Sequence, residues 1–328
     1  MCYSAMVEQD AKKLARMFNA KVQTDFYSEL FGRRLEGEKL TINKAMEIPF
    51  LKNASSMEEK AIASKIRKWH ENEIKRLNEE LEKQEIRLKK AEETLKEKET
   101  KKAFEDKRIS TSKISKCKFD IARHETENLK SESESRIYPF NYISVLCLDD
   151  GGNKVIRPMR YHMRPHNENE SFDETHGGCY NARFDSLTKV RFWNDSLLKR
   201  RGLMVLKKFY ENVPIEKYPN RKNLPAEIQN QNNIVICFEP KGIENMFIPV
   251  IWDCWEKSGQ PQLYSAALIT DEPAPEIRAT GHDRTPIFIK EIAVDNWLKA
   301  QGTAKEIKDI FLSDREKPYY DHEVMGAA

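Results

Sequence analysis

The chain has 328 residues, enough for one large domain or two, and its 39% hydrophobic and 33% charged content indicates that part of it is solvated helix rather than core. The formal net charge of +3 does not by itself indicate a nucleic-acid-binding protein, because local clustering of charge matters more than the sum. No apolar run approaches the roughly 20 residues that span a bilayer, and the N-terminus lacks the features of a signal peptide, so a membrane protein is excluded.

The six cysteines are scattered and form no CxxC pair. Neither a zinc site nor a disulfide framework is therefore favoured, and a reducing cytoplasm fits best. We expect a cytoplasmic protein with no metal and no cofactor.

The first feature with chemical content is the cysteine at position 2. Removal of Met1, which a small second side chain permits, leaves Cys2 with a free α-amine beside its thiol. An α-amine has a pKa of about 7.7–8.0, so a nucleophilic fraction exists at neutral pH, and an ionised thiol is also a strong nucleophile. Such a 1,2-aminothiol condenses with an aldehyde to a Schiff base and then closes to a thiazolidine. The alternative is that Cys2 is an accident of a mobile terminus.

Two short amphipathic helices are expected next, at Asp10–Phe18 and around Phe26–Arg34. From about Ser55 the chain reads as a long charged helix, and a second helix around Ser112–Leu129 is expected to fold back on it. The long helix carries a heptad seam, broken at Gln84, of Ile74, Leu77, Leu81, Leu88, Ala91 and Leu95. We predict an inserted coiled-coil hairpin, with a solvated or disordered spacer as the alternative. Recruitment of a partner, self-association and reach along DNA all stay open as its role.

After Tyr138 the sequence is typical of short strands and turns. Residues Tyr142 to Met163 contain an apolar strand, an Asp-Asp-Gly-Gly turn and a second strand, which predict a hairpin. Further strands are expected at Gly202–Tyr210, Asn233–Glu239, Phe247–Cys254, Leu263–Thr270 and Thr285–Ile289. Helices are expected near Asp185–Leu187, Asp295–Gln301 and Ala304–Phe311. The sequence therefore predicts an α+β fold, rich in strands, with a helical insertion.

Four segments of this strand-rich part carry side chains that could do chemistry. Each has a plain structural reading: a Glu at a strand end is usually solvated, a loop His beside Asp and Arg is usually at the surface, and Asn-Ala-Arg favours a turn. The segments are CYNARFDSL with Asn181 and Arg183, VLKKFYENV with Glu211, ATGHDRTPIFI with His282 and Arg284, and MRYHMRP with Met159, Tyr161 and Pro165.

Together with the initial MCYSA, these segments in this order resemble the SOS response-associated peptidase family, which includes sensors of abasic sites in single-stranded DNA. The resemblance covers residues 1 to about 50 and 138 to 300. It is carried by Asn181–Arg183, Phe209–Glu211, His282–Pro286 and a stretch like the family's Met-Arg-Trp-Gly-Leu-x-Pro strand. It implies a barrel-like domain with peripheral helices. The predicted plan is an N-terminal part with Cys2 at 1–50, a coiled-coil insertion at 51–135, the main catalytic domain at 136–312 and a tail at 313–328.

The resemblance also implies a role for each matching residue. Cys2 would crosslink to DNA, and Glu211 would be the general acid/base for Schiff-base formation and ring closure. His282 would help to open the abasic sugar to its aldehyde or would stabilise its hydroxyl. Asn181 would hold the Cys2 end of the site, and Arg183 would contact a phosphate. Further DNA contacts are expected from Arg160, Tyr161, Pro165 and Arg284.

A single DNA strand also requires a positive groove and stacking surfaces. Further candidates for these are Arg157, Arg164, Arg191, Lys199, Arg200, Arg201, Lys207, Lys208, Phe192 and Trp193. The chain departs from the family pattern where Tyr3 and Ser4 replace the usual Gly-Arg, which removes a basic residue expected at a phosphate. Tyr161 stands where Trp is common, and His162 where Gly is common.

Three functions are consistent with this sequence. The first is a DNA-repair protein that traps abasic sites in single-stranded DNA as a covalent thiazolidine. The second is a thiol autopeptidase that uses Cys2 as its nucleophile, which is disfavoured because only Met1 precedes Cys2. The third is a scaffold in which the coiled coil is the functional part and the site is vestigial.

Overall fold

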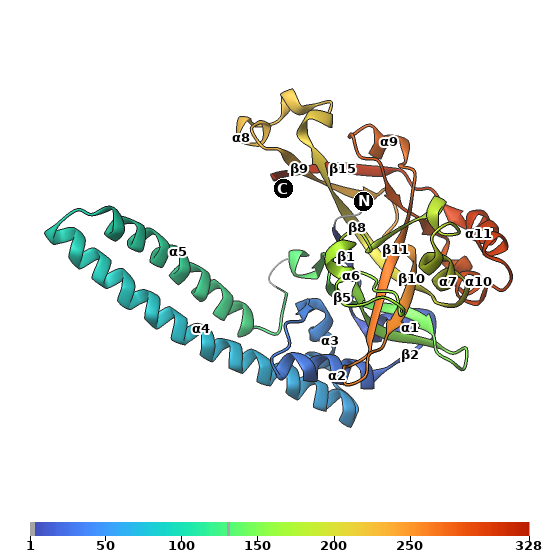
Figure 1. Ribbon diagram of the computed structural model, residues 1–328, viewed down its shortest axis with the longest axis horizontal. Coiled ribbons are helices and arrows are strands. Elements are labelled where there is room, and N and C mark those ends of the chain that lie inside the picture. The colour runs from blue at the N-terminus through green and yellow to red at the C-terminus, as the bar shows by residue number, and fades with distance from the viewer. Residues whose placement is uncertain (1–3, 130–131, 328) are drawn as a thin grey trace. The chain divides into compact units, whose positions relative to one another are not determined.

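The computed structural model describes residues 4–129 and 132–327 (Figure 1). The chain divides into two compact units. We call them the sheet unit, which comprises residues 1–27, 40–46 and 132–328, and the helical unit, which comprises residues 28–39 and 47–131. Among the described residues, no helix combines the length and apolar character needed to cross a membrane.

A closed five-stranded barrel forms the core of the sheet unit. Its order is β10-β11-β6-β5-β8, and the pairing of β8 with β10 closes it. Pairing is antiparallel except between β11 and β6. The strands are β5 (Asn141–Leu148), β6 (Lys154–Tyr161), β8 (Arg201–Pro214), β10 (Met246–Trp255) and β11 (Leu263–Asp271). The α+β, barrel-like fold is thus confirmed.

The β5–β6 hairpin forms where the sequence predicts it. The Asp149 carboxylate accepts hydrogen bonds from the backbone N–H groups of Gly151 and Asn153, which closes the turn. Gly152 has φ +78°, a conformation that glycine adopts without steric cost. Leu148 then lies opposite Lys154, so the register follows from this turn.

Short strands and one long pair extend the barrel. Strand β1 (Ser4–Val7) lies between β8 and β4 (Arg136–Ile137), while β9 (Asn233–Pro240) pairs with both β8 and β15 (Tyr320–Ala327). The strand expected at Thr285–Ile289 is divided in two. The other short strands are β2 (Lys21–Val22), β3 (Thr41–Ile42), β7 (Asn181–Arg183), β12 (Thr285–Pro286), β13 (Phe288–Ile289) and β14 (Arg315–Glu316).

Helices α1 (Ala11–Phe18), α10 (Val294–Lys299) and α11 (Ala304–Ser313) of the sheet unit form where the sequence predicts them. Asp10 caps the first by accepting from the N–H groups of Lys12 and Lys13. The helix expected at Asp185–Leu187 is instead a single 3-10 turn, Phe184–Ser186. The helices that were not predicted are α6 (Phe172–Thr175), α7 (Arg191–Lys199), α8 (Ala226–Gln229) and α9 (Pro275–Arg278).

A buried arginine at the start of β8 holds two helix ends together. The Arg201 guanidinium donates five hydrogen bonds to backbone carbonyls at the C-terminal ends of α7 and α10. Helix C-termini carry unsatisfied carbonyls and partial negative charge, so a buried cation is stabilised there. Arg201 was a candidate for the DNA groove, and that expectation is wrong because its donors are directed inward.

Arg201→Met is expected to lower the free energy of unfolding by about 3–5 kcal/mol, because the buried carbonyls lose their donors. Urea denaturation of the full chain measures this. The control is Arg191→Met, since the Arg191 side chain is 89% exposed; a change within about 0.5 kcal/mol is expected there. Equal effects of the two substitutions would contradict this account of Arg201.

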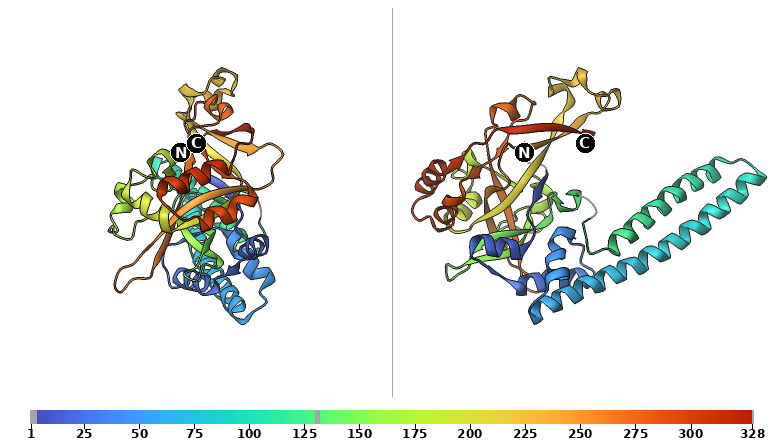
Figure 2. Two further views of the ribbon diagram at one scale, coloured as in Figure 1. Left: turned by 90° about the vertical axis from the view of Figure 1, so that its right-hand side faces the viewer. Right: turned by 180° about the vertical axis from the view of Figure 1, so that it is seen from behind.

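The helical unit is dominated by α4 (Met57–Glu97) and α5 (Lys101–His124), which run side by side as a hairpin (Figures 1 and 2). Gln84, the expected break in the seam, is buried in it and donates to Glu80. The second helix begins well before Ser112, because Thr100 caps it by accepting from the N–H of Ala103. The charged first turns of α5 hide its period in the sequence.

The base of the hairpin is a buried polar cluster within the helical unit. Helices α2 (Thr24–Leu35) and α3 (Lys44–Asn53) contribute Arg34 and Glu47, whose ion pair is 2.6 Å long. The Glu47 carboxylate also lies 2.8 Å from Nε2 of His70, and His70 Nδ1 lies 2.7 Å from Nδ1 of His124. Burial lowers the pKa of His124 to about 4, so His124 is neutral at pH 7 and one imidazole can accept from the other.

Candidate active site

The start of β1 places the N-terminal end of the described chain beside β8. Cys2 lies outside the described residues, and the first of them, Ser4, is paired with Tyr210. Arg136 holds this end: its guanidinium donates to the Ser4 hydroxyl at 2.7 and 2.9 Å and lies 3.7 Å from the centre of the Tyr210 ring. Ser4 therefore lies next to the part of β8 that carries Glu211.

Glu211 is fully buried and pairs with His282. It lies inside β8, not at a strand end as the sequence suggested, and its exposed fraction is 0%. Its Oε2 atom lies 3.2 Å from Nε2 of His282. Nδ1 of His282 lies 3.0 Å from the carbonyl oxygen of Arg284 and 3.3 Å from its N–H. The sequence-predicted acid/base residues are thus in direct contact.

The hydrogen bonds of His282 determine where the proton between Glu211 and His282 lies. Burial lowers the pKa of His282 to about 4, so its imidazole is neutral at pH 7. If Nδ1 accepts from the N–H of Arg284, Nε2 carries the proton and donates to Glu211. If Nδ1 donates to the carbonyl of Arg284, the Glu211 carboxyl donates to Nε2 instead. In both arrangements one proton lies between the two side chains, which suits them to pass it to a reacting group.

A glycine fixes the loop that presents His282. Gly281 has φ +90°, and a Cβ there would lie 2.5 Å from the carbonyl oxygen of Lys217. Gly259 also has positive φ, +77°, but a Cβ there meets nothing within 4 Å. Substitution of these two glycines therefore separates the cost of a positive φ, which both share, from the cost of the close approach to Lys217, which only Gly281 has.

Gly281→Ala is expected to destabilise the protein by at least about 1 kcal/mol more than Gly259→Ala, which pays only the conformational cost of about 1–2 kcal/mol. Urea denaturation of the two variants measures the difference. The same substitution should displace His282 from Glu211. Equal losses of stability would show that the approach to Lys217 does not constrain this loop.

Two further predicted segments meet at the end of β11. Strand β7 runs parallel to β11, which places Asn181 opposite Leu268 and Arg183 opposite Thr270. Strand β12 pairs with the same end, since Pro286 also lies opposite Thr270. The segments Asn-Ala-Arg and His-Asp-Arg-Thr-Pro lie far apart in the chain, and they flank one strand end.

Three of the predicted DNA-contacting residues are held by the protein itself. Tyr161 is 1% exposed, and its hydroxyl donates to Oδ1 of Asn181 at 3.5 Å. Pro165 is buried. Arg284 is also buried, with Nη1 3.6 Å from the Glu272 carboxylate. Tyr161 therefore presents no open ring surface for a base. Arg183, by contrast, is exposed, and its guanidinium donates to both carboxylate oxygens of the equally exposed Asp185 at 3.1 and 3.0 Å.

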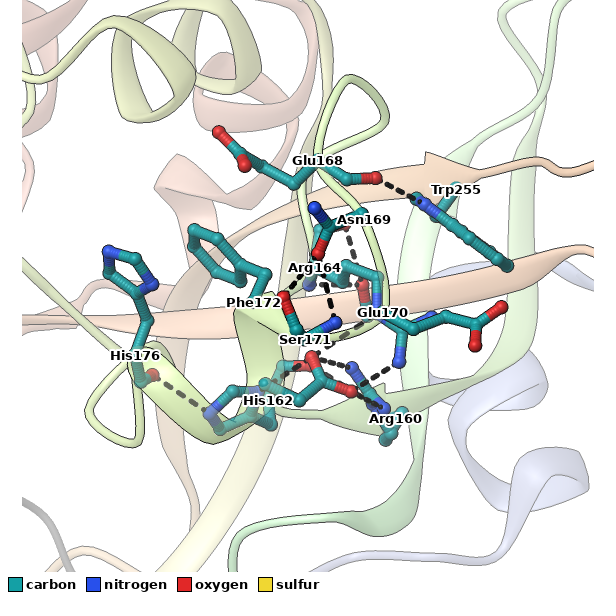
Figure 3. Close-up of polar contacts among 12 residues, drawn as sticks. Arg160, His162, Arg164, Glu168, Asn169, Glu170, Ser171, Phe172, His176 and Trp255 are labelled. Carbon is teal, nitrogen blue, oxygen red and sulfur yellow. Dashed lines mark hydrogen bonds and ion pairs between the residues drawn. The ribbon is translucent and has the colours of Figure 1, made fainter.

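An acidic residue that the sequence did not single out organises the loop after β6, where Figure 3 labels Arg160, His162 and Arg164. Asp173 accepts from Arg160 at 2.7 and 3.0 Å and from Arg164. These arginines lower the pKa of Asp173 against the opposing effect of its burial. His162, beside them, lies 3.2 Å from the carbonyl oxygen of His176 through Nε2. Two arginines four residues apart, at the end of an apolar strand and in the loop after it, were the signal that a carboxylate would be needed.

Two other arginines expected in the DNA groove are buried against aromatic rings. Arg157 lies 4.4 Å from the ring centre of Phe26 and 4.3 Å from that of Tyr264. Arg164 lies 4.6 Å from the ring centre of Trp255. As groove residues both predictions are wrong, because each guanidinium is covered by its neighbours.

A cavity of about 370 Å³ lies near the site without including its reactive residues. It is formed by residues 271–276 and 315–320, with Thr285 and Pro286 from the segment that follows His282. Glu211 and His282 are not in its lining, so the geometry of the pair, and not this cavity, defines the candidate site. In the described ranges, 4–129 and 132–327, no group of three His, Cys, Asp or Glu side chains is placed to hold a metal ion.

The fold and site define a β-barrel protein with a buried Glu–His pair beside its N-terminal strand. The family model for SOS response associated peptidase (SRAP) matches residues 86–325, well over half of the chain. The chain belongs to this family, which supports a role related to abasic sites in DNA and to the SOS response. The matched range begins within α4, so residues 1–85 lie outside it.

Three solved structures give further comparisons. A protein from Bacteroides thetaiotaomicron has 14% sequence identity and a TM-score of 0.45, covering 58% of this chain and 76% of its own. A protein from Bordetella bronchiseptica has 14% identity and a TM-score of 0.45, covering 58% and 87%. A phage-related protein from Bordetella bronchiseptica has 12% identity and a TM-score of 0.42, covering 58% and 80%. No curated protein sequence matches the chain.

Proposed function

We propose that this protein captures abasic sites in single-stranded DNA as a covalent thiazolidine on Cys2. The observation that carries the proposal is the pairing of Ser4 with Tyr210, directly before Glu211 in β8. Two peptide units separate Cys2 from Ser4, so the two Cα atoms are at most about 8 Å apart. We propose that the Cys2 aminothiol, within this chain length of Ser4, acts beside the Glu211–His282 pair.

The proposed reaction balances without an oxidant or reductant. The ring-opened abasic sugar presents an aldehyde, and the Cys2 amine nitrogen attacks its carbonyl carbon. The resulting hydroxyl leaves as water with a proton supplied by the site, which gives the Schiff base. The Cys2 sulfur then adds to the same carbon while the nitrogen takes up a proton, and a five-membered ring closes. One water is the sole by-product.

Glu211 and His282 are proposed to move these protons. The two side chains share a proton, and Glu211 is fully buried. Because water is excluded from Glu211, bulk water does not compete with the reacting group for this proton. The His282 imidazole is neutral at pH 7, so it can accept a proton from the sugar hydroxyl during ring opening. General acid–base catalysis of this kind contributes about 10²–10⁴-fold in rate.

The remaining predicted residues are proposed to bind DNA or to support the site. Arg183 is exposed and beside the end of β11, which suits a contact with a phosphate. Asn181, held by Tyr161, is proposed to orient the Cys2 end. Arg284 is proposed to position His282 through its backbone. Pro165 and Arg160 lie in or beside the loop that Asp173 organises. They are proposed to support the DNA strand where it bends at the abasic site.

The test is incubation of the Met1-processed full chain with a single-stranded oligonucleotide that contains one abasic site. A shift in mobility that survives denaturant is expected, and an identical oligonucleotide with an intact base should give none. Absence of the shift would overturn the proposal. A shift of equal yield with the intact oligonucleotide would also overturn it, because the aldehyde would then not be the reacting group.

A further inference from the structure

Phe140 is held in a costly conformation beside the candidate site. Its φ is +72°, a left-handed conformation that a bulky side chain adopts only when its surroundings impose it. Its ring stacks on the His162 imidazole, with 4.3 Å between ring centres and 16° between planes. The Arg160 guanidinium lies 5.4 Å from the centre of the same ring. Despite these contacts Phe140 remains 41% exposed.

The backbone ties Phe140 to two parts of the candidate site. Its N–H donates to the carbonyl oxygen of Tyr161 at 2.8 Å, and the Tyr161 hydroxyl in turn bonds Asn181. The chain reaches Phe140 from β4, where Ile137 lies opposite Ala5. Because that pairing is antiparallel, the chain beyond Ile137 runs toward the Ser4 end of β1. Phe140 thus follows the strand that runs beside the Ser4 end of β1.

Few other aromatic rings of the sheet unit are open to a base. Among the described residues of that unit, the large aromatic side chains that are more than about a third exposed are Tyr138, Phe140 and Tyr319. Tyr138 lies within 5.1 Å of the Arg136 guanidinium, and Tyr319 borders the separate cavity described above. Tyr161 and Trp193, which the sequence suggested for stacking, are buried.

We propose that Phe140 is a stacking platform for the nucleobase next to the abasic site in single-stranded DNA. The inference rests on the proposed function for the identity of the strand. One side of the ring is backed by the rigid imidazole of His162, so the ring is preorganised and little side-chain entropy is lost on binding. A base has a π-face whatever its identity, so the platform accepts any neighbouring base. The strained backbone is then the means of directing the ring.

The test uses two oligonucleotides with a central tetrahydrofuran, which lacks the aldehyde and cannot crosslink. The first has adenine on both sides of it, and the second has a tetrahydrofuran at those positions as well. Fluorescence anisotropy with the full chain should show that wild type binds the first about 5- to 100-fold more tightly. Phe140→Gly should remove most of this preference, and Phe140→Tyr should keep it.

Controls separate this inference from folding and from the proposed function. Phe140→Gly loses the contact of the ring with His162 but relieves the positive φ, so the two effects oppose each other and the thermal unfolding midpoint should stay near that of wild type. Tyr319→Gly removes an aromatic ring that is 59% exposed and should leave the preference intact. A wild type without the preference, or a Phe140→Gly variant that retains it, would overturn the platform. Tetrahydrofuran has no aldehyde to react with Cys2. Failure of the platform in this experiment is therefore distinguishable from failure of the crosslinking test of the proposed function.

Discussion

Cys2→Ala is expected to abolish the denaturant-stable product with abasic single-stranded DNA. The substitution keeps the α-amine and removes the thiol, so the Schiff base can form but the ring cannot close. An imine hydrolyses once the complex is denatured, whereas a thiazolidine persists. The expected loss of stable product is more than about 100-fold, because without the sulfur no ring can close and only the imine, which hydrolyses, remains; in free energy this corresponds to about 2.7 kcal/mol or more. Denaturing gel electrophoresis of the reaction measures it.

Cys2→Ser is the matched control for this prediction. Its hydroxyl is a far weaker nucleophile than a thiolate, so the variant should give an imine that appears on the gel only after reduction with borohydride. A stable product from Cys2→Ala without reduction would contradict the thiazolidine mechanism. Cys254, which is half-buried, is a suitable second control, and Cys254→Ser should react as wild type does.

Glu211→Gln is expected to slow capture by about 10²–10⁴-fold while leaving the affinity for single-stranded DNA unchanged. The amide has the size of the carboxyl and can still contact Nε2 of His282, but it cannot transfer the proton that lies between them. Single-turnover rates of crosslink formation measure the first effect. Anisotropy with a tetrahydrofuran oligonucleotide measures the second.

The control for Glu211 is a carboxylate of the same chain outside the site. Glu216 follows β8 and is exposed, so Glu216→Gln should leave the rate of capture unchanged. A Glu211→Gln variant that captures DNA at the wild-type rate would show that the buried carboxyl is not the proton-transfer group. A variant that loses DNA affinity in proportion to its rate would assign Glu211 to binding instead.

Local patterns were enough to predict most of the elements. Alternation and the Asp-Asp-Gly-Gly turn predicted the β5–β6 hairpin, and three-then-four spacing predicted α4. The start of α5 was missed because its first turns are charged and its cap at Thr100 is a single residue. The end of β8 was missed because Glu211 interrupts the apolar run, although the buried partner that tolerates it, His282, lies 71 positions further on.

Long-range contacts explain what the sequence could not predict. Arg201, Arg157 and Arg164 look alike in sequence, as basic residues near strands, and each is buried by a different neighbour. Arg201 serves two helix ends, Arg157 lies between aromatic rings, and Arg164 meets Asp173. Composition alone cannot separate such residues from a DNA-binding groove, because only the fold supplies their partners.

The reactive residues were easier to predict than their surroundings. The order of short motifs singled out Glu211 and His282, and the structure places them 3.2 Å apart. The residues that support the site were not predicted. The contact of Arg136 with Ser4 and the stacking of Phe140 on His162 have no local signature in the sequence. The predicted boundary of the insertion at 51–135 and the cytoplasmic location stay predictions.

Mass spectrometry of the digested crosslink tests the central claim most directly. After reaction with abasic single-stranded DNA, denaturation and digestion by nuclease and protease, the sugar remnant is predicted on the N-terminal peptide. That peptide should begin at Cys2, lack Met1, and carry the remnant with the loss of one water and without any reducing agent. A remnant found on a lysine, or on a peptide that retains Met1, would contradict capture by the Cys2 aminothiol.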